Sequence, residues 1–177
     1  SETSGKALVG ALTGNMMIRI AKSGLIVLFG LLVIAFALNN VANFEIAIGM
    51  VSFVLSQAEH TAYPGSLVPA LAGNTIAIAT LCFIIAAELA TGAVLIKGGF
   101  DMTRASRHSA TAFEDAKSTA LLGCLMAIGV WFGLFVVIAG GFYQMWQTPL
   151  GRGSFDDSFT IVIFAALLFL VVRSKDD

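Results

Sequence analysis

Four long apolar stretches, separated by polar segments, dominate the chain. They run over about 23–41, 75–96, 119–142 and 158–172. A helix needs roughly 20 mostly apolar residues to cross a hydrocarbon core about 30 Å thick, and the fourth stretch reaches that length only with its flanking residues. The pattern therefore predicts an all-α fold: an integral membrane four-helix bundle that forms a single transmembrane domain over residues 1–177.

The connection between the first two stretches, residues 42–73, is itself partly apolar. Its apolar positions mix helical and alternating spacing: Phe44, Ile46, Ile48, Val51, Val54 and Leu55. We expect a short external amphipathic helix at the membrane interface, followed by a turn at Tyr63-Pro64-Gly65. The other connections are expected to be a solvated hairpin over 97–118, which opens with Gly98-Gly99, and a short external turn over 148–153.

Basic residues lie almost entirely on one side of the predicted bundle. With four spans, that side holds Lys6, Arg19, Lys22, Lys97, Arg104, Arg107, Lys117, Arg173 and Lys175. The opposite side holds only Arg152. Because cytoplasmic segments of membrane proteins retain Lys and Arg, we expect both termini on the cytoplasmic side.

Composition excludes several other classes of protein. The chain is 58% hydrophobic and 12% charged, with a mean hydropathy of +0.90. Soluble domains carry about twice that share of charge, and disordered chains have few aromatic residues and a high net charge. Ten basic residues are balanced by eleven acidic ones, so no nucleic-acid partner is expected.

Small residues in the second and third stretches indicate close helix packing. Ala86 and Ala90 lie four apart on one face of the second stretch, and Gly129 and Gly133 do the same on the third. Helices in lipid approach one another through such positions. Two interpretations stay open, which are packing within the bundle and a surface for another subunit.

Polar and aromatic residues mark the external membrane boundary. Asn39, Asn40 and Asn43 cluster where the first stretch ends, and they are expected to cap the helix end or to bind a returning loop. A ligand site is the alternative function for this cluster. Tyr143 and Trp146 follow the third stretch, where amphipathic rings act as interfacial anchors.

Glu88 is the acidic residue inside a predicted span. It precedes Lys97 by nine residues, which places it roughly 13 Å inside the bilayer at 1.5 Å per residue. A carboxyl group at that depth is expensive, and it marks a candidate functional site. Three hypotheses follow: a neutral, hydrogen-bonded packing residue, a proton or ligand site, and a contact with a partner.

The remaining reactive residues do not form a catalytic pattern. His60 and His108 are predicted on opposite sides of the membrane, so they cannot bind one metal together. Cys82 and Cys124 lie about 10 Å apart in depth, too far for a disulfide. No CxxC, P-loop, dinucleotide fingerprint or nucleophile elbow occurs in the sequence. We expect no enzyme activity, metal or cofactor.

Several short motifs together resemble a known family. They are Arg19-x-x-Lys22, Asn39-Asn40, Ser56 with Tyr63-Pro64-Gly65, Glu88, Phe113-x-x-x-Lys117 and Met145-Trp146-Gln147. In this order they resemble the bacterial small integral membrane proteins grouped as domain of unknown function 2165. The sequence departs from the family pattern at Phe53, where a histidine is usual, and over 150–153. The resemblance implies four spans and a bacterial inner membrane, without an established activity.

The leading functional hypothesis is a non-catalytic accessory or structural subunit of a larger membrane complex, such as a respiratory or photosynthetic redox assembly. The alternatives are a small proton-linked carrier or channel that uses Glu88, and a membrane protein that binds a lipid or quinone in a groove between spans. The expected partners are the lipid bilayer and other membrane subunits, with a bound lipid or quinone as a further partner.

Overall fold

The computed structural model describes the backbone over residues 2–176 and the side chains over residues 14–176. Its helices are α1 (Glu2–Ala42), α2 (Phe44–Leu55), α3 (Asn74–Ala105), α4 (Ala110–Ile128), η1 (Gly129–Phe142), η2 (Met145–Gln147) and α5 (Pro149–Arg173). Four helical stretches are long and apolar enough to cross a membrane: α1 from residue 14, α3, α4 with η1, and α5. The predicted all-α fold with four spans and the apolar helix α2 between the first two is confirmed.

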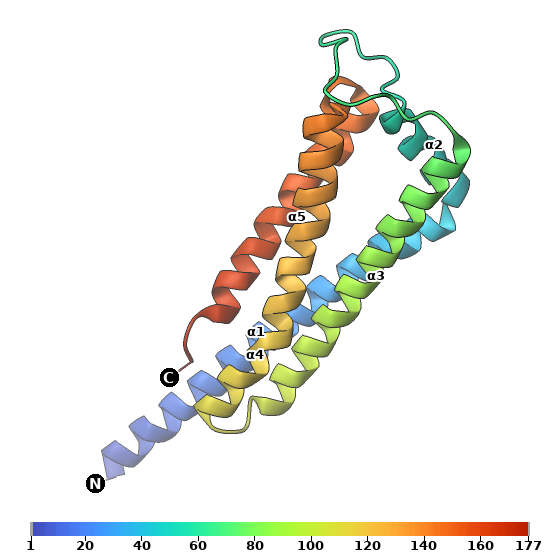
Figure 1. The fold of residues 1–177 in the computed structure, drawn as a ribbon. Helices are drawn as coiled ribbons and strands as arrows, with labels where there is room; N and C mark the ends of the chain where they lie inside the picture. The colour runs from blue at the N-terminus through green and yellow to red at the C-terminus, as the bar shows by residue number, and fades with distance from the viewer. Residues whose placement is uncertain (1, 177) are drawn as a thin grey trace.

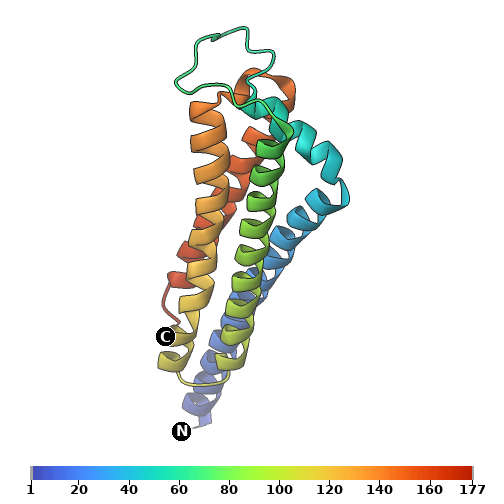
Figure 2. The same cartoon turned by 45° about the vertical axis from the view of Figure 1, so that its right-hand side comes forward.

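The long helices lie side by side, as Figures 1 and 2 show. Helix α3 packs against both α1 and α4, and α5 packs against α4 and η1. Helix α2 and the connection over residues 56–73 lie at one end of the bundle, which we call the loop end. Both ends of the described chain lie at the other, which we call the terminal end.

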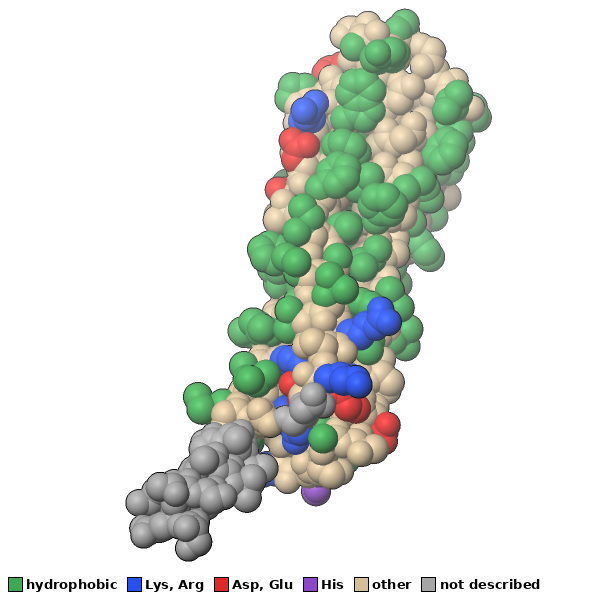
Figure 3. Space-filling view, turned by 90° about the vertical axis from the view of Figure 1, so that its left-hand side faces the viewer, with side chains coloured by type: hydrophobic (Ala, Val, Ile, Leu, Met, Phe, Trp, Pro, Cys, Tyr) green, Lys and Arg blue, Asp and Glu red, His purple; other side chains and the backbone are tan. Residues whose placement is uncertain are grey.

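Apolar side chains cover the outside of the bundle as well as its inside. Figure 3 shows them along most of one face, between charged groups nearer the two ends. Leu28 on α1 and Ile163 on α5 are among the large apolar residues that stay exposed. A soluble monomer rarely exposes a contiguous apolar surface this large, whereas an integral membrane protein needs one to contact lipid.

The buried core runs along the length of the four spans. Its fully buried residues include Ile26, Val33, Leu95, Met102, Phe113, Ala120, Cys124, Ala127, Ala165 and Val172. Gly98 lies in this core, where an added Cβ would overlap the backbone of Ala120. The prediction that Gly98-Gly99 opens a solvated hairpin is therefore wrong. Both glycines are buried inside α3 and let α3 approach its neighbours closely.

The predicted external turn over 148–153 is also corrected, because these residues begin α5. The hydroxyl of Thr148 accepts a hydrogen bond from the backbone N–H of Gly151 at 3.2 Å, which caps the helix. Pro149 occupies the first helical position, where its missing N–H carries no penalty. This start lengthens the fourth span from the predicted 158–172 to 25 residues.

The third span changes its winding at Gly129. From there to Phe142 the backbone follows a π-helix, and the hydrogen bond from Tyr143 N to Ile138 O at 3.0 Å closes the last i→i+5 turn. Gln144 then takes a left-handed conformation with φ of 53° and leads into η2. Such winding frequently occurs at functional sites, and η1 here forms one wall of the cavity described next.

Candidate functional site

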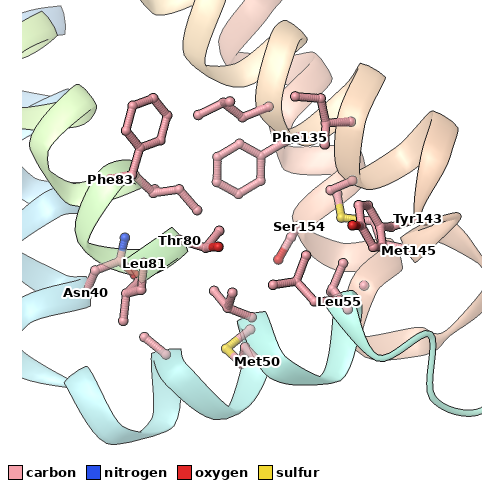
Figure 4. Close-up of a pocket in the computed structure, with 18 of the residues that line it drawn as sticks. Asn40, Met50, Leu55, Thr80, Leu81, Phe83, Phe135, Tyr143, Met145 and Ser154 are labelled. Atoms are coloured by element: carbon pink, nitrogen blue, oxygen red, sulfur yellow. The ribbon is translucent and has the colours of Figure 1, made fainter. Parts of the chain in front are cut away.

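A cavity of about 200 Å³ lies at the loop end of the bundle; we call it the loop-end pocket. Its walls come from α2, α3, η1, η2 and α5, with one residue from α1 (Figure 4). The lining residues are Asn40, Ala47, Met50, Val51, Val54, Leu55, Thr80, Leu81, Phe83, Ile84, Leu134, Phe135, Ile138, Ala139, Tyr143, Met145, Leu150, Gly151 and Ser154. The pocket joins segments that lie more than one hundred residues apart in the chain.

The lining of this pocket is apolar apart from a few hydrogen-bonding groups. Figure 4 shows the side chains of Thr80 and Ser154 on opposite sides, with Phe135 between them at one edge and Asn40 beside Leu81. Among the described lining residues, none carries a charge. A concave apolar surface with a few polar groups is the usual form of a small-molecule site.

Asn40 links the pocket to Glu88, the intramembrane carboxyl group singled out in the sequence. The Nδ2 group of Asn40 donates a hydrogen bond to Oε2 of Glu88 at 3.2 Å. Glu88 is only 2% exposed, so this bond satisfies part of a carboxyl group that would otherwise be costly to bury. The contact joins α1 to α3 across 48 residues of sequence.

The three clustered asparagines divide between two roles. Asn43 donates its side-chain N–H to the backbone oxygen of Asn39 at 3.0 Å, one helical turn away. Both of these residues are exposed, and neither lines the loop-end pocket. Only Asn40 of the predicted cluster therefore belongs to the candidate site.

Tyr143 and Trp146 do not occupy equivalent positions. Tyr143 is 9% exposed and lines the pocket, so its interpretation as an anchor at the membrane surface is corrected. The sequence pattern indicated where the span ends. It contained no signal for the last turn of η1, after which the ring of Tyr143 faces the pocket. Trp146 is half-buried, and its ring meets that of Tyr63 edge-on with centroids 5.7 Å apart.

The long loop before α3 is fastened beside the pocket by further hydrogen bonds. The backbone N–H of Tyr63 donates to Oε1 of Gln147 at 2.8 Å, and Nε2 of Gln147 donates to the oxygen of Tyr63 at 3.1 Å. Nε2 of Gln144 donates to the oxygen of Gly65 at 3.2 Å. These contacts hold the loop against η2, whose Met145 lines the pocket.

The small residues predicted to pack helices face outward in this chain. Ala86, Ala90 and Gly129 are exposed, and an added Cβ at Gly129 or Gly133 would meet no heavy atom within 4 Å. The interpretation of these positions as close contacts within the bundle is therefore corrected. Gly98 and other glycines supply those contacts instead, and packing at the four predicted positions stays a prediction for a contact with another chain.

At the terminal end, two of the family-like motifs contact the segment that follows α5, described over residues 174–176, which we call the tail. Lys22 from the first motif and Lys117 from a later one both form ion pairs with Asp176, at 2.8 and 2.6 Å. The sequence indicated the two lysines as markers of orientation and as parts of the family-like motifs, but it indicated no role for Asp176. The spacing of the charges along the chain contains no signal for this contact, because it depends on how α1, α4 and the tail converge.

Comparison with known proteins identifies one matching family. The family model described as "Predicted small integral membrane protein (DUF2165)" matches residues 18–175. No curated protein and no solved structure matches the chain. The family match covers the first span from residue 18, the other three spans and the loop-end pocket, and it ends one residue before Asp176.

Proposed function

The chain belongs to this family of small integral membrane proteins, and from that premise we propose that it binds one neutral amphipathic molecule in the loop-end pocket. The ligand class is a quinone or a neutral lipid, and the protein is not an enzyme. The observation that carries the proposal is the pocket itself, an apolar cavity with hydrogen-bonding groups at a few positions and no charged lining residue among those described.

The size of the pocket suits part of such a molecule. An apolar protein cavity of about 150 Å³ is large enough to take up a benzene ring, and the loop-end pocket measures about 200 Å³. It can therefore enclose one ring or a short length of hydrocarbon chain. The remainder of the ligand would lie along the exposed apolar surface of the helices, as lipids do.

The polar groups favour an uncharged head on the ligand. The hydroxyls of Thr80 and Ser154 can each donate or accept a hydrogen bond, and the amide of Asn40 has a second N–H besides the one it gives to Glu88. These groups suit carbonyl or hydroxyl oxygens. A phosphate group would enter without a balancing charge, which is unfavourable in an apolar site.

A substitution that fills the cavity tests this proposal. Thr80→Phe places a ring in the pocket, and Ala86→Phe is the matched control because Ala86 lies on the same helix but is exposed. Native mass spectrometry after gentle extraction should find a discrete neutral ligand on wild type and Ala86→Phe, with most of it lost from Thr80→Phe. Ser154→Phe provides a second filling variant from α5.

Equal retention of the same ligand by all variants, each with a normal unfolding temperature, would reject the loop-end pocket as its site. A wild-type protein that carries only a mixture of ordinary phospholipids would reject the proposed ligand class. The two results are distinguishable because the first concerns position and the second concerns chemical identity.

A second function, an accessory subunit of a larger membrane complex, has its own supporting observation. An open hollow of about 230 Å³ lies between α3 and the third span, and it is lined by Phe83, Ala87, Ala90, Thr91, Met126, Gly129, Val130 and Leu134. Small residues there would let a transmembrane helix of a partner approach closely. Loss of co-purifying protein in Gly129→Leu, with an unchanged fold, is the expected result.

The proposed setting is the bacterial inner membrane with both termini in the cytoplasm. The support is the distribution of Lys and Arg, which places nine of the ten on the terminal side of the four spans. The proton carrier stays a third hypothesis, with Glu88 as its proton site. It has less support, because a proton pathway uses a series of polar groups. In the described structure, Asn40 is the side chain that hydrogen-bonds to this carboxyl group.

A further inference from the structure

Three basic side chains gather at the terminal end of the bundle, well away from the loop-end pocket. Arg19 and Lys22 come from α1, and Lys117 comes from α4. They are 8%, 6% and 2% exposed, which is unusual for charged residues. Figure 3 shows basic and acidic side chains gathered in this region of the surface. We call the three residues the basic cluster.

The tail of the chain lies in the basic cluster. Asp176 forms ion pairs with Lys22 at 2.8 Å and with Lys117 at 2.6 Å, and its backbone oxygen accepts a hydrogen bond from Arg19 at 2.9 Å. The backbone oxygen of Ser174 accepts further hydrogen bonds from Lys22 at 3.0 Å and from Lys117 at 2.7 Å. The tail thus supplies several of the oxygen atoms that these cations contact, while the backbone oxygen of His108 and the carboxylate of Glu114 supply others.

Within residues 14–176, the contacts of the basic cluster leave an excess of positive charge and one donor without an acceptor. The two carboxylates in contact with the cluster are Asp176 and Glu114, and Glu114 pairs with Lys117 at 2.6 Å. Three positive charges therefore face two negative ones among the described residues. In addition, the buried Nε of Arg19 has no hydrogen-bond partner in the described part of the chain, although a buried donor of this kind normally has one.

The surface beside this cluster is suited to contact with lipid. Met17, Ile18 and Ile20 beside Arg19 are exposed apolar residues on a membrane-spanning helix. Arg19, Lys22 and Lys117 lie near the terminal ends of two candidate spans, and the ends of membrane-spanning helices are where headgroups are expected. Arg and Lys together are well suited to bind phosphate oxygens, because both donate several charge-assisted hydrogen bonds.

We propose that Arg19, Lys22 and Lys117 form a binding site for the phosphate of an anionic membrane lipid, and that Asp176 fills this site until such a lipid displaces it. The single negative charge of a phosphodiester replaces that of the Asp176 carboxylate. Its additional oxygen atoms supply an acceptor for the Nε of Arg19. The tail is then released while Glu114 continues to pair with Lys117.

Displacement of the tail can be measured directly on the full chain. A spin label at Lys175→Cys, with Cys82 and Cys124 replaced, reports the motion of the tail by electron paramagnetic resonance, and Lys175 is exposed. In nanodiscs that contain phosphatidylglycerol the label should become more mobile than in phosphatidylcholine nanodiscs. Inorganic phosphate added to the phosphatidylcholine sample should leave the label unchanged.

Lipid affinity provides the second measurement. Asp176→Asn removes the competing carboxylate, so native mass spectrometry should show about tenfold tighter binding of phosphatidylglycerol, the scale of one buried charge contact. Asp156→Asn is the control, because it removes an exposed carboxylate near the start of α5. If Asp176→Asn fails to fold, a chain that ends at Arg173 removes the same contacts.

Equal label mobility in both lipids, with equal affinity in wild type and Asp176→Asn, would overturn the proposal. Release of the tail by inorganic phosphate alone would overturn the assignment to a lipid. A response to phosphatidylglycerol that persists in Arg19→Gln and Lys22→Gln would show that the lipid acts elsewhere on the molecule.

Discussion

The hydrogen bond between Asn40 and Glu88 shows what single residues do in this bundle. It joins α1 to α3 and lies beside the loop-end pocket, which Asn40 also lines. The sequence indicated each residue separately, as a buried acid and as a member of an asparagine cluster. Their pairing could not be predicted from depth in the membrane. If the helices were straight and untilted, the residue of the first span at the depth of Glu88 would be Leu31 and not Asn40.

Substitution of Glu88 separates a structural role from a role in proton transfer. Glu88→Gln keeps an acceptor for Asn40, so the unfolding temperature in detergent should hardly change. Glu88→Leu leaves the amide of Asn40 without that acceptor and should destabilise the protein by about 1–3 kcal/mol. Thermal unfolding of the two variants checks this difference.

The carrier hypothesis is tested with the same conservative variant. A carrier that uses Glu88 needs a group that gains and loses a proton, and Gln cannot do so. Proton flux into liposomes should be absent for both wild type and Glu88→Gln. Flux in wild type that disappears in Glu88→Gln would instead make the carrier the leading function.

The tail contact should depend on pH in a defined direction. Burial alone would raise the pKa of Asp176, but hydrogen bonds and charge interactions with Lys117 and Lys22 outweigh it and lower the pKa below its ordinary value of 3.8. The contact is therefore fully present above about pH 4 and is lost as the pH falls through the lower pKa of the folded state.

The spin label at residue 175 measures this transition. Its mobility should stay constant from neutral pH to about pH 4 and rise at lower pH. Glu114 also pairs with Lys117, so Glu114→Gln is the control that identifies its share. A rise centred near neutral pH, or none in the acid range, would contradict the assignment to Asp176.

At the scale of elements, hydrophobic patterning predicted the existence of every span but misplaced several ends. Four apolar stretches were enough to predict four membrane-length helices, because length and polarity decide that outcome. The start of α5 was missed although Thr148-Pro149 is a recognisable helix start. The helix over Gly98-Gly99 was missed because glycine is a turn signal in water and a packing residue between membrane helices.

Two kinds of glycine should respond differently to a bulky side chain. Gly98→Leu should destabilise the isolated protein by about 1–3 kcal/mol or more, since its added atoms meet the backbone of Ala120. Gly133→Leu should leave the stability of the isolated chain nearly unchanged, because no atom lies within 4 Å of its Cβ position. Chemical or thermal unfolding in the same detergent compares them.

Gly133→Leu also tests the accessory-subunit proposal. If a partner helix uses this outward face, the variant should fold normally but lose co-purifying protein. Retention of the same partners by Gly133→Leu and Gly129→Leu would show that the face contacts only lipid.

At the scale of the whole molecule, the chain forms a bundle whose two ends differ in chemistry. The terminal end carries the basic cluster and both ends of the described chain, whereas the loop end carries α2 and the apolar pocket. The sequence predicted this polarity through its Lys and Arg distribution. It could not predict the pocket, because the cavity forms only where α2, α3, η1 and α5 converge.

The proposed orientation in the membrane, with both termini in the cytoplasm, rests on the same asymmetry. A reporter that is active only in the cytoplasm should be active when it is fused after residue 177. The reason is that nine of the ten basic residues lie on the terminal side of the spans. A second reporter inserted at Gly65, in the loop at the opposite end, should show the reverse result. An inactive cytoplasmic reporter at residue 177, together with an active one at Gly65, would reverse the assignment of the two ends.

The most direct test of the central claim is photocrosslinking from inside the loop-end pocket. A diazirine analogue of leucine replaces Leu55, which lines the pocket, and in a separate sample replaces Leu167, which is exposed on α5. Mass spectrometry of the irradiated protein should find one discrete neutral amphipathic adduct at position 55, absent in the Thr80→Phe background, and a mixture of bulk phospholipids at position 167. The same phospholipid mixture at both positions would contradict the proposed site.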